Sequence, residues 1–219
     1  MPTFTELKAA ADSAGQVRKV LEAVAFWMPM SSELPTALLD ANKSLLEMPE
    51  GAVPLGMVNK EGYKFATEVN KEDTDAFGYG NPVRTDIDKA PKTIEFSLMQ
   101  DGRQLVASLV YGLDLSAVPT LATGEVVFDE PPIPIMEEGR LLLIGRDGVG
   151  LKEQFRGRGY PRVKLAEVPE EAWATDNPVM YPLKLDVLID DQVGTPCRHY
   201  LGGKGFDATA LGWQPVTAP

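Results

Sequence analysis

The chain has 219 residues, of which 32 are acidic and 21 are basic, so its formal net charge is −11. One Cys and one His are too few for a Cys/His zinc site or a histidine-based triad, and the acidic balance disfavours binding of nucleic-acid phosphates over the whole surface. An apolar content of 44% with 24% charged residues argues against disorder. We therefore expect a folded protein made in a reducing cytoplasm. No membrane contact is expected, since no apolar run reaches the roughly 20 residues of a spanning helix.

The first 25 residues favour an amphipathic helix. Apolar and small residues recur there at spacings of three and four, namely Leu7, Ala11, Ala14, Val17, Leu21 and Val24. Thr3 and Glu6 have the spacing of a capping box at the start of such a helix. Prolines punctuate the chain that follows. We interpret residues 1–54 as a helical arm and a linker, and two roles of the arm stay open: covering the core or docking on a neighbouring subunit.

The middle of the chain switches to a period of two, the pattern of strands with one buried and one wet face. Three such strands are predicted, over 63–69, 83–88 and 94–98. The stretch 70–81 between the first two strands is charged and then glycine-rich, so we expect it to form a long, mobile hairpin tip.

A short helix is predicted over 101–111. Its apolar stripe consists of Leu105, Val106, Leu109 and Val110. Asp101 is placed to cap the first turn, and Gly112 stands where a left-handed residue ends many helices. We therefore expect this helix to pack on a sheet.

The second half of the chain returns to strands separated by turns. They are predicted over 125–128, 141–145, 158–168, 181–189 and 197–201. About eight strands with one central helix make a mainly β fold, a β-sandwich that we place at 55–204. Residues 205–219 form an extended C-terminal arm, which we expect to dock because it carries Phe206, Leu211 and Trp213.

No group of residues has the spacing of a catalytic or ligand site. Cys197 and His199 would share one face of a strand, but no third or fourth soft ligand accompanies them. The glycine-rich stretches 145–150 and 202–205 match neither a P-loop nor a dinucleotide-binding motif. Neighbouring acids on a strand point to opposite faces and do not converge on one bond. We therefore expect no enzymatic activity, no cofactor and no metal.

The charges are unevenly distributed along the chain. Residues 140–164 contain seven basic and two acidic side chains, a local +5 that leaves −16 for the remainder. The run R-G-R-G-Y-P-R at 156–162 superficially resembles a nucleic-acid-binding tract. In so acidic a chain we favour a basic hairpin that meets an acidic patch on a neighbouring copy. Arg156, Arg158 and Arg162 are then candidate interface residues.

One family has the same order of elements. The matching stretches are L-G-M-V-N-K-E-G-Y at 55–63, the runs 66–75, 82–87 and 93–98, and L-V-A-S-L-V-Y-G-L-D at 105–114. These stretches resemble the sandwich entry, long-loop hairpin and short helix of the major tail tube proteins of long-tailed phages with non-contractile tails. The resemblance covers residues 55–201, while the N-terminal helix and the Pro-rich insert 131–134 depart from the simplest members. It implies a tail-tube-type β-sandwich with one short packed helix, a helical N-terminal arm and an extended C-terminal arm.

The resemblance also implies a function. Such proteins form hexameric rings that stack into a tube, with one sheet of each subunit joining its neighbours around a lumen. Loops and arms lock ring to ring, and the tape-measure protein and the genomic DNA pass through the lumen without specific binding. The partners are then other copies of the chain, the tape-measure protein and the tail-tip and terminator proteins, and the location is the tail of the virion.

Candidate residues follow for each role in such a tube. Three acids on the wet faces of the early strands are candidates for the lumen: Glu68, Asp86 and Asp88. Candidates for contacts between subunits or rings are Asp73, Asp75, Tyr79, Arg156, Arg158, Arg162 and Trp213. An acidic lumen would repel DNA phosphates and so let the genome pass.

Two alternatives stay open. One is the tube protein of a contractile tail or of a type VI-like secretion system, which would have a sheath partner. The other is a monomeric ligand-binding or hydrolytic β-sandwich, which would have a discrete apolar pocket with converging polar groups.

Overall fold

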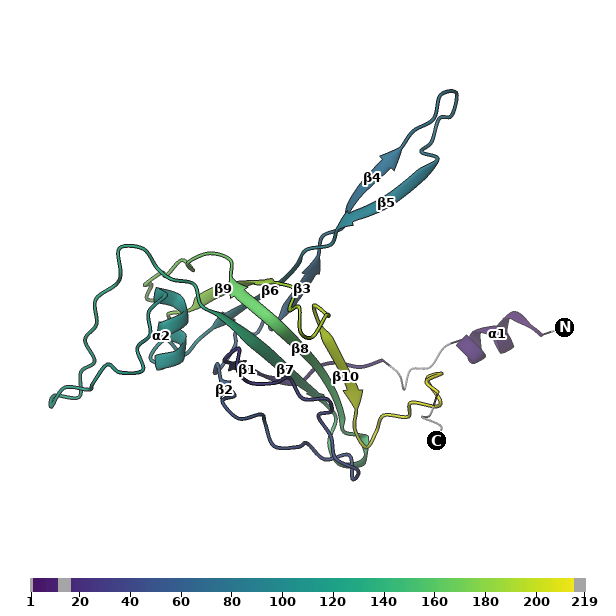
Figure 1. Ribbon diagram of the computed structural model, residues 1–219. Helices are drawn as coiled ribbons and strands as arrows, with labels where there is room; N and C mark the ends of the chain where they lie inside the picture. Colours follow the sequence, from purple (N-terminus) through teal and green to yellow (C-terminus); the bar gives the residue numbers. More distant parts are fainter. Residues whose placement is uncertain (1, 12–16, 215–219) are drawn as a thin grey trace.

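The computed structural model describes residues 2–11 and 17–214 and shows a mainly β protein with antiparallel sheets and few helices (Figure 1). In chain order the elements are α1 (Phe4–Ala11), β1 (Glu22–Met28), β2 (Val53–Pro54), β3 (Lys64–Thr67), β4 (Asn70–Thr74), β5 (Arg84–Lys89), β6 (Lys92–Leu98), α2 (Gln104–Tyr111), β7 (Glu138–Asp147), the 3-10 turn η2 (Gly150–Lys152), β8 (Gln154–Leu165), β9 (Tyr181–Val187) and β10 (Arg198–Gly202). The predicted mainly β class is confirmed.

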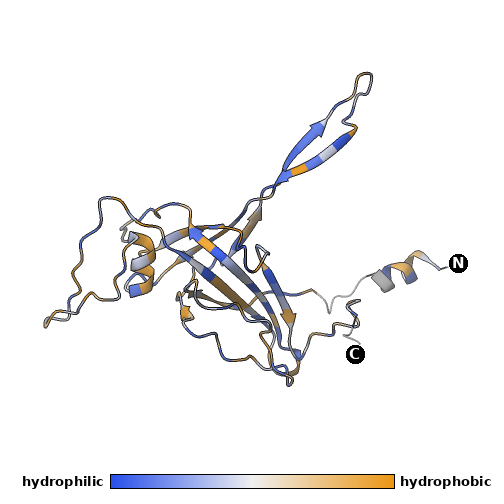
Figure 2. Ribbon diagram, in the orientation of Figure 1, coloured by the Kyte–Doolittle hydropathy of each residue, from blue (hydrophilic) through white to orange (hydrophobic). Residues whose placement is uncertain are grey.

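One eight-stranded sheet forms the body. Seven of its strands follow the order β2-β1-β7-β8-β9-β6-β3, and the eighth, β10, pairs with β8. Strand β8, with 12 residues, has two partners on one side: its first part pairs with β10, and residues 163–165 pair with β9. All of these pairings are antiparallel. Strands β4 and β5 pair only with each other and project from the body as a separate ribbon, which is mostly hydrophilic in Figure 2.

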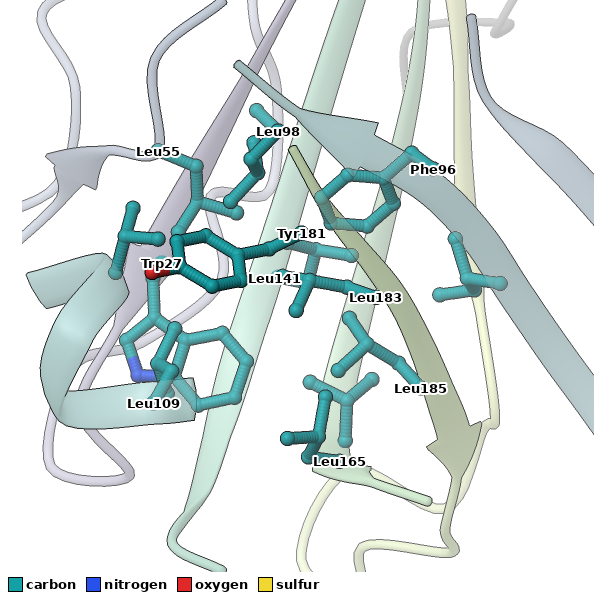
Figure 3. Close-up of a cluster of buried hydrophobic side chains, with 14 of the residues drawn as sticks. Trp27, Leu55, Phe96, Leu98, Leu109, Leu141, Leu165, Tyr181, Leu183 and Leu185 are labelled. Atoms are coloured by element: carbon teal, nitrogen blue, oxygen red, sulfur yellow. The ribbon is translucent and has the colours of Figure 1, made fainter. Parts of the chain in front are cut away.

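The main core lies between the sheet and α2 (Figure 3). Its largest buried side chains include Trp27, Leu55, Ile94, Phe96, Leu98, Leu141, Tyr181, Leu183 and Leu185. The helix contributes Val106, Leu109 and Val110, which are three of the four residues of the predicted apolar stripe. Alternate burial along β6 and β9 agrees with the period of two in their sequences, so these strands are confirmed with small shifts at their ends.

A second, smaller core lies on the opposite face of β7. It consists of Met28, Leu34, Leu38, Leu142, Ile144, Phe155 and Tyr200. The irregular segment 29–52 covers this face, and the Tyr200 hydroxyl donates a hydrogen bond to the carbonyl of Pro35 at 2.6 Å. Because both faces of β7 are covered, its run of apolar residues at 141–144 is continuous and does not alternate.

The two glycines of the R-G-R-G-Y run, Gly157 and Gly159, face this second core and leave space for its side chains. A side chain at Gly157 would collide with Leu38, and one at Gly159 would crowd Leu34 and the Tyr200 hydroxyl. Both glycines therefore make room for segment 29–52, while the alternate arginines of β8 point to the other face. The run is explained by packing within the chain.

The predicted helix over the first 25 residues is wrong in its second half. Helix α1 ends at Ala11, and the capping box at its start is confirmed by hydrogen bonds between Thr3 and Glu6 in both directions. Ala14 lies outside the described residues. Residues Glu22–Met28 form β1, which pairs with β7 over its whole length. Packing of alternate residues in two cores outweighs the weak helical preference of this stretch, so from β1 on the N-terminal 54 residues belong to the body, not to an arm.

Other predictions need correction as well. No strand forms over 125–128, where the structure has one isolated bridge between Thr120 and Val126. Residues 70–74, expected in a hairpin tip, form strand β4. Every residue of β3 and β5 is exposed, so the predicted buried faces at 63–69 and 83–88 are absent from these strands, and of the first face Tyr63, before β3, packs against the main core.

The cap of α2 also differs from the prediction. Arg103, not Asp101, holds the N-cap position, and it makes no side-chain capping bond. The carboxylate of Asp101 instead accepts a hydrogen bond from the Gly102 N–H at 3.0 Å. The other end of the helix is as predicted, with Gly112 in the left-handed region at φ 60°.

Candidate functional site

The ribbon of β4 and β5, which we call the projecting ribbon (residues 70–89), has no buried strand residue. The turn at its end carries Phe77 and Tyr79, whose relative exposures are 105% and 72%. Exposed aromatic side chains at the end of a projecting element are typical of contact surfaces. Phe77 had not been singled out from the sequence, because a turn gives no periodic signal that separates a buried phenylalanine from an exposed one.

The two faces of the projecting ribbon differ in charge. Glu72 and Asp86 are directly opposite each other in the ladder, so their two carboxylates share a face, and a register shift between Asn70 and Lys71 interrupts the alternation before Asp88. Arg84 shares this face and donates two hydrogen bonds to the Asp86 carboxylate, at 2.6 and 3.0 Å. The face that carries Glu72 and Asp86 is therefore acidic, and the Arg84 on it is already paired with Asp86.

Most predicted site residues of the early strands lie on or beside this ribbon: Glu68, Asp73, Asp75, Tyr79, Asp86 and Asp88. Glu68 lies at the base, where its N–H donates to the carbonyl of Pro91 at 2.9 Å. Asp73 accepts a hydrogen bond from the Thr85 hydroxyl at 2.6 Å, so its side chain ties the two strands together. The lumen candidates and the ribbon-tip candidates therefore belong to one element of the structure, the projecting ribbon and its base.

Two basic residues of β8, Arg158 and Arg162, are held by contacts with other side chains of the same chain. The Arg158 guanidinium lies 3.8 Å from the centre of the Phe65 ring, which in turn stacks on Tyr160. Such a cation–π contact holds the guanidinium against its own chain. Arg162 donates two hydrogen bonds to the Glu138 carboxylate, at 2.8 and 3.1 Å, and this lowers the pKa of Glu138.

Much of the +5 charge of residues 140–164 is compensated by acids from elsewhere in the chain. Three of its seven basic residues have such partners: Arg140 pairs with Asp190, Arg146 with Glu22 and Arg162 with Glu138. The Arg140–Asp190 pair is buried, with side-chain exposures of 7% and 6% and an N–O distance of 3.3 Å. Counting these three acids reduces the local charge from +5 to +2. Arg156 stays exposed and is the basic candidate best placed to meet a partner.

The surroundings of Tyr160, Cys197 and His199 favour the neutral forms of these three side chains. Burial raises the pKa of Tyr160 to about 12 and raises the pKa of the Cys197 thiol. The pKa of His199 is lowered, by burial first and then by the positive charges of Arg158, Lys92 and Arg156. A protonated thiol and a neutral imidazole on a strand end do not make an activated nucleophile. Within the described residues no group of three or more His, Cys, Asp or Glu side chains is placed to hold a metal ion.

A groove lies between the two terminal segments and the end of β7 and β8, and we call it the basic groove. It has a volume of about 290 Å³ and is lined by Arg18, Lys19, Val20, Gly145, Asp147, Gln154, Phe155, Arg156, Leu201, Phe206, Leu211 and Trp213. Three residues of the C-terminal segment, Phe206, Leu211 and Trp213, line this groove, and Trp213 is 58% exposed. Residues 215–219 lie outside the described residues.

Both α-helices, at eight residues each, are too short to span a membrane, and no longer apolar helix exists in the described ranges. No protein-family model matches this chain, and no curated protein matches its sequence. The features of this chain that bear on its function are the projecting ribbon, the charged surfaces and the end strands β2 and β3 of the sheet.

Proposed function

We propose that this protein is the subunit of a phage tail tube, in which hexameric rings stack around a lumen that passes the tape-measure protein and the genomic DNA. The order of elements over residues 55–201 resembles that of such subunits. The antiparallel sheet with one short helix packed on its core is compatible with their sandwich. In this proposal the chain assembles with itself and with tail-tip and terminator proteins, and its place is the virion tail.

The projecting ribbon is the observation that carries the proposal. A two-stranded ribbon alone is marginally stable in water, because it buries little apolar surface. Here every strand residue is exposed, and the tip presents Phe77 and Tyr79 to solvent. A stacked assembly would cover this tip with the neighbouring ring. We therefore assign Asp73, Asp75 and Tyr79 to contacts between rings.

The ends of the sheet support self-assembly in the plane of a ring. Strands β2 and β3 are its outermost strands, and each pairs with a neighbour on one side only. Unpaired strand edges attract other strands unless they are covered or blocked. A closed ring of copies would cover such edges by a repeated contact, which is the usual way in which identical subunits satisfy them.

The acidic face of the ribbon fits a conduit for DNA. Repulsion between carboxylates and phosphates would let the genome slide, whereas basic groups would hold it. In this proposal Asp86 and Asp88, together with Glu68 at the ribbon base, face the lumen. Glu72 joins this set because it lies opposite Asp86.

The tip of the ribbon provides the test. We expect the purified wild-type protein to form striated tubes in electron micrographs, and Phe77→Ser with Tyr79→Ser to leave separate rings or monomers. Trp173→Ser is the matched control, because Trp173 is 84% exposed on a different loop, and this variant should still form tubes. Tubes of the double variant that match the wild type in number and length would contradict the assignment of the tip to ring stacking.

A further inference from the structure

The loop that joins α2 to β7, residues 114–137, is both acidic and apolar, and we call it the acidic loop. It contains five acids and no base: Asp114, Glu125, Asp129, Glu130 and Glu137. It also exposes five large apolar side chains, each at least 48% exposed: Leu121, Val126, Val127, Ile133 and Ile135. Apolar side chains gathered on one exposed segment are typical of a contact surface.

Hydrogen bonds hold the acidic loop in a defined shape. At its base the Ile135 N–H donates to the Gly112 carbonyl at 3.1 Å, and at its tip the Leu121 N–H donates to the Glu125 carbonyl at 2.8 Å. The ring of Phe128 packs against Tyr111, with 5.4 Å between the ring centres. These contacts anchor the loop on α2, while its five exposed apolar side chains stay in contact with water.

The basic groove has the complementary character. Its charged lining residues are Arg18, Lys19, Arg156 and Asp147, a net charge of +2. Its apolar lining includes Leu201, Leu211 and Trp213, which are 44%, 40% and 58% exposed. A surface that combines exposed apolar side chains with charged ones is typical of a protein contact.

The acidic loop lies far from the basic groove of its own chain. The loop joins β7 at Glu138, whereas the groove includes Gly145 and Asp147 at the opposite end of the same strand. Ten strand residues span roughly 30 Å. Figure 1 shows the loop extending from the body on the side opposite to the two chain ends. A contact between the two surfaces therefore requires two copies.

We propose that the acidic loop of one copy docks in the basic groove of the next copy. The carboxylates of Asp129 and Glu130 would face Arg18 and Arg156, and the apolar residues of the loop would cover Trp213. Opposite charges at the rim fix the orientation of the two copies. Because the two surfaces differ, the contact runs head to tail, and it forms a ring where the rotation between successive copies closes. This inference rests on the proposed function, for which it names the contact between subunits of one ring.

Reciprocal charge reversal tests the contact. Arg18→Glu with Arg156→Glu, and separately Asp129→Lys with Glu130→Lys, should each weaken self-association at least about tenfold, because like charges would then meet. A mixture of the two double variants should recover association, since each supplies the surface that the other has lost. Sedimentation velocity and electron microscopy measure the assemblies. Glu167→Lys with Glu170→Lys is the control, because it changes the net charge as much as the loop variant but lies on another exposed loop.

Each outcome bears on the proposal. Recovery in the mixture, with association retained in the control, supports docking of the loop in the groove. Unchanged association of either double variant overturns it, as does failure of the mixture to recover while both variants stay folded by circular dichroism. Tubes that form regardless of the reversals overturn this inference and leave the tube function standing. Assemblies that follow the charge pattern but never form tubes support the contact and contradict the tube function.

Discussion

At Tyr63 the demands of packing and hydrogen bonding conflict. Its ring packs against Phe96 with 5.2 Å between ring centres. Among the described residues, its hydroxyl is the one buried side-chain polar atom without a hydrogen-bond partner. A buried, unpaired hydroxyl costs about 1–3 kcal/mol relative to its state in water. The ring therefore stabilises the main core while the hydroxyl destabilises it.

Tyr63→Phe should increase the free energy of unfolding by about 1 kcal/mol, because it removes the unpaired hydroxyl and keeps the ring. Tyr200→Phe is the matched comparison, since its hydroxyl donates a 2.6 Å hydrogen bond to Pro35. That variant should lose about 1 kcal/mol. Urea unfolding monitored by circular dichroism measures both. A loss of stability in Tyr63→Phe would show that the hydroxyl has a partner in solution.

Tyr63 also makes the free energy of unfolding depend on pH. Burial raises the pKa of Tyr63 from 10.0 in the unfolded chain to about 12. Above pH 10 the unfolded state loses this proton before the folded state does, so stability is complete below pH 10 and falls as the pH rises towards 12. Unfolding of Tyr63→Phe at a series of alkaline pH values should show a shallower fall than the wild type. Equal slopes would contradict the burial of the hydroxyl.

The net charge of residues 140–164, counted from the sequence, does not include the ion pairs that these residues make with distant parts of the chain. The seven basic residues are evident in the sequence, and their excess predicted an interface. Three of them meet acids that are distant in the chain, and Arg158 lies on Phe65, so only part of the excess faces outward. Local composition does not report such pairings, because they depend on strand register. Arg156 is the candidate that keeps its predicted exposure.

At the scale of elements, β8 shows why a glycine–arginine run need not bind nucleic acid. Gly157→Ala should lower the free energy of unfolding by about 1–3 kcal/mol, because the added methyl group would press on Leu38 and Tyr200 in a filled core. Gly102→Ala is the control, since a methyl group there meets no atom and the backbone is not in the left-handed region. It should change stability by less than about 0.5 kcal/mol. Equal effects of the two substitutions would contradict the role of Gly157 in packing.

Strands could be predicted where one face alone is buried. The alternation at 94–98 and 181–189 carries this information directly, and both became strands. Strand β1 was not predicted because its apolar residues also fit helical spacing. Strand β4 was not predicted because its sequence N-K-E-D-T has no apolar residue. Strands β4 and β5 are joined by their antiparallel backbone pairing, and no strand residue of either is buried in a core. Residues 125–128 have strand-like composition but no neighbouring strand to pair with.

At the scale of the whole molecule, five of the seven residues that the sequence predicts as interface candidates fall on two separate surfaces. The projecting ribbon carries Asp73, Asp75 and Tyr79, and the basic groove carries Arg156 and Trp213. The acidic loop is a third surface, for which the sequence predicts a strand at 125–128 and a Pro-rich insert at 131–134. Its exposure follows from the anchoring of its ends on α2 and β7, which no local pattern reports. In the proposed tube, the three surfaces would give one chain separate contacts for stacking rings and for closing them.

Electron microscopy of the purified full-length protein over a range of concentrations tests the central claim most directly. We expect hollow tubes of uniform width with a regular axial repeat, and end views with sixfold symmetry. Particles that stay the size of a single 23.8 kDa chain at every concentration would contradict the proposed tail-tube function.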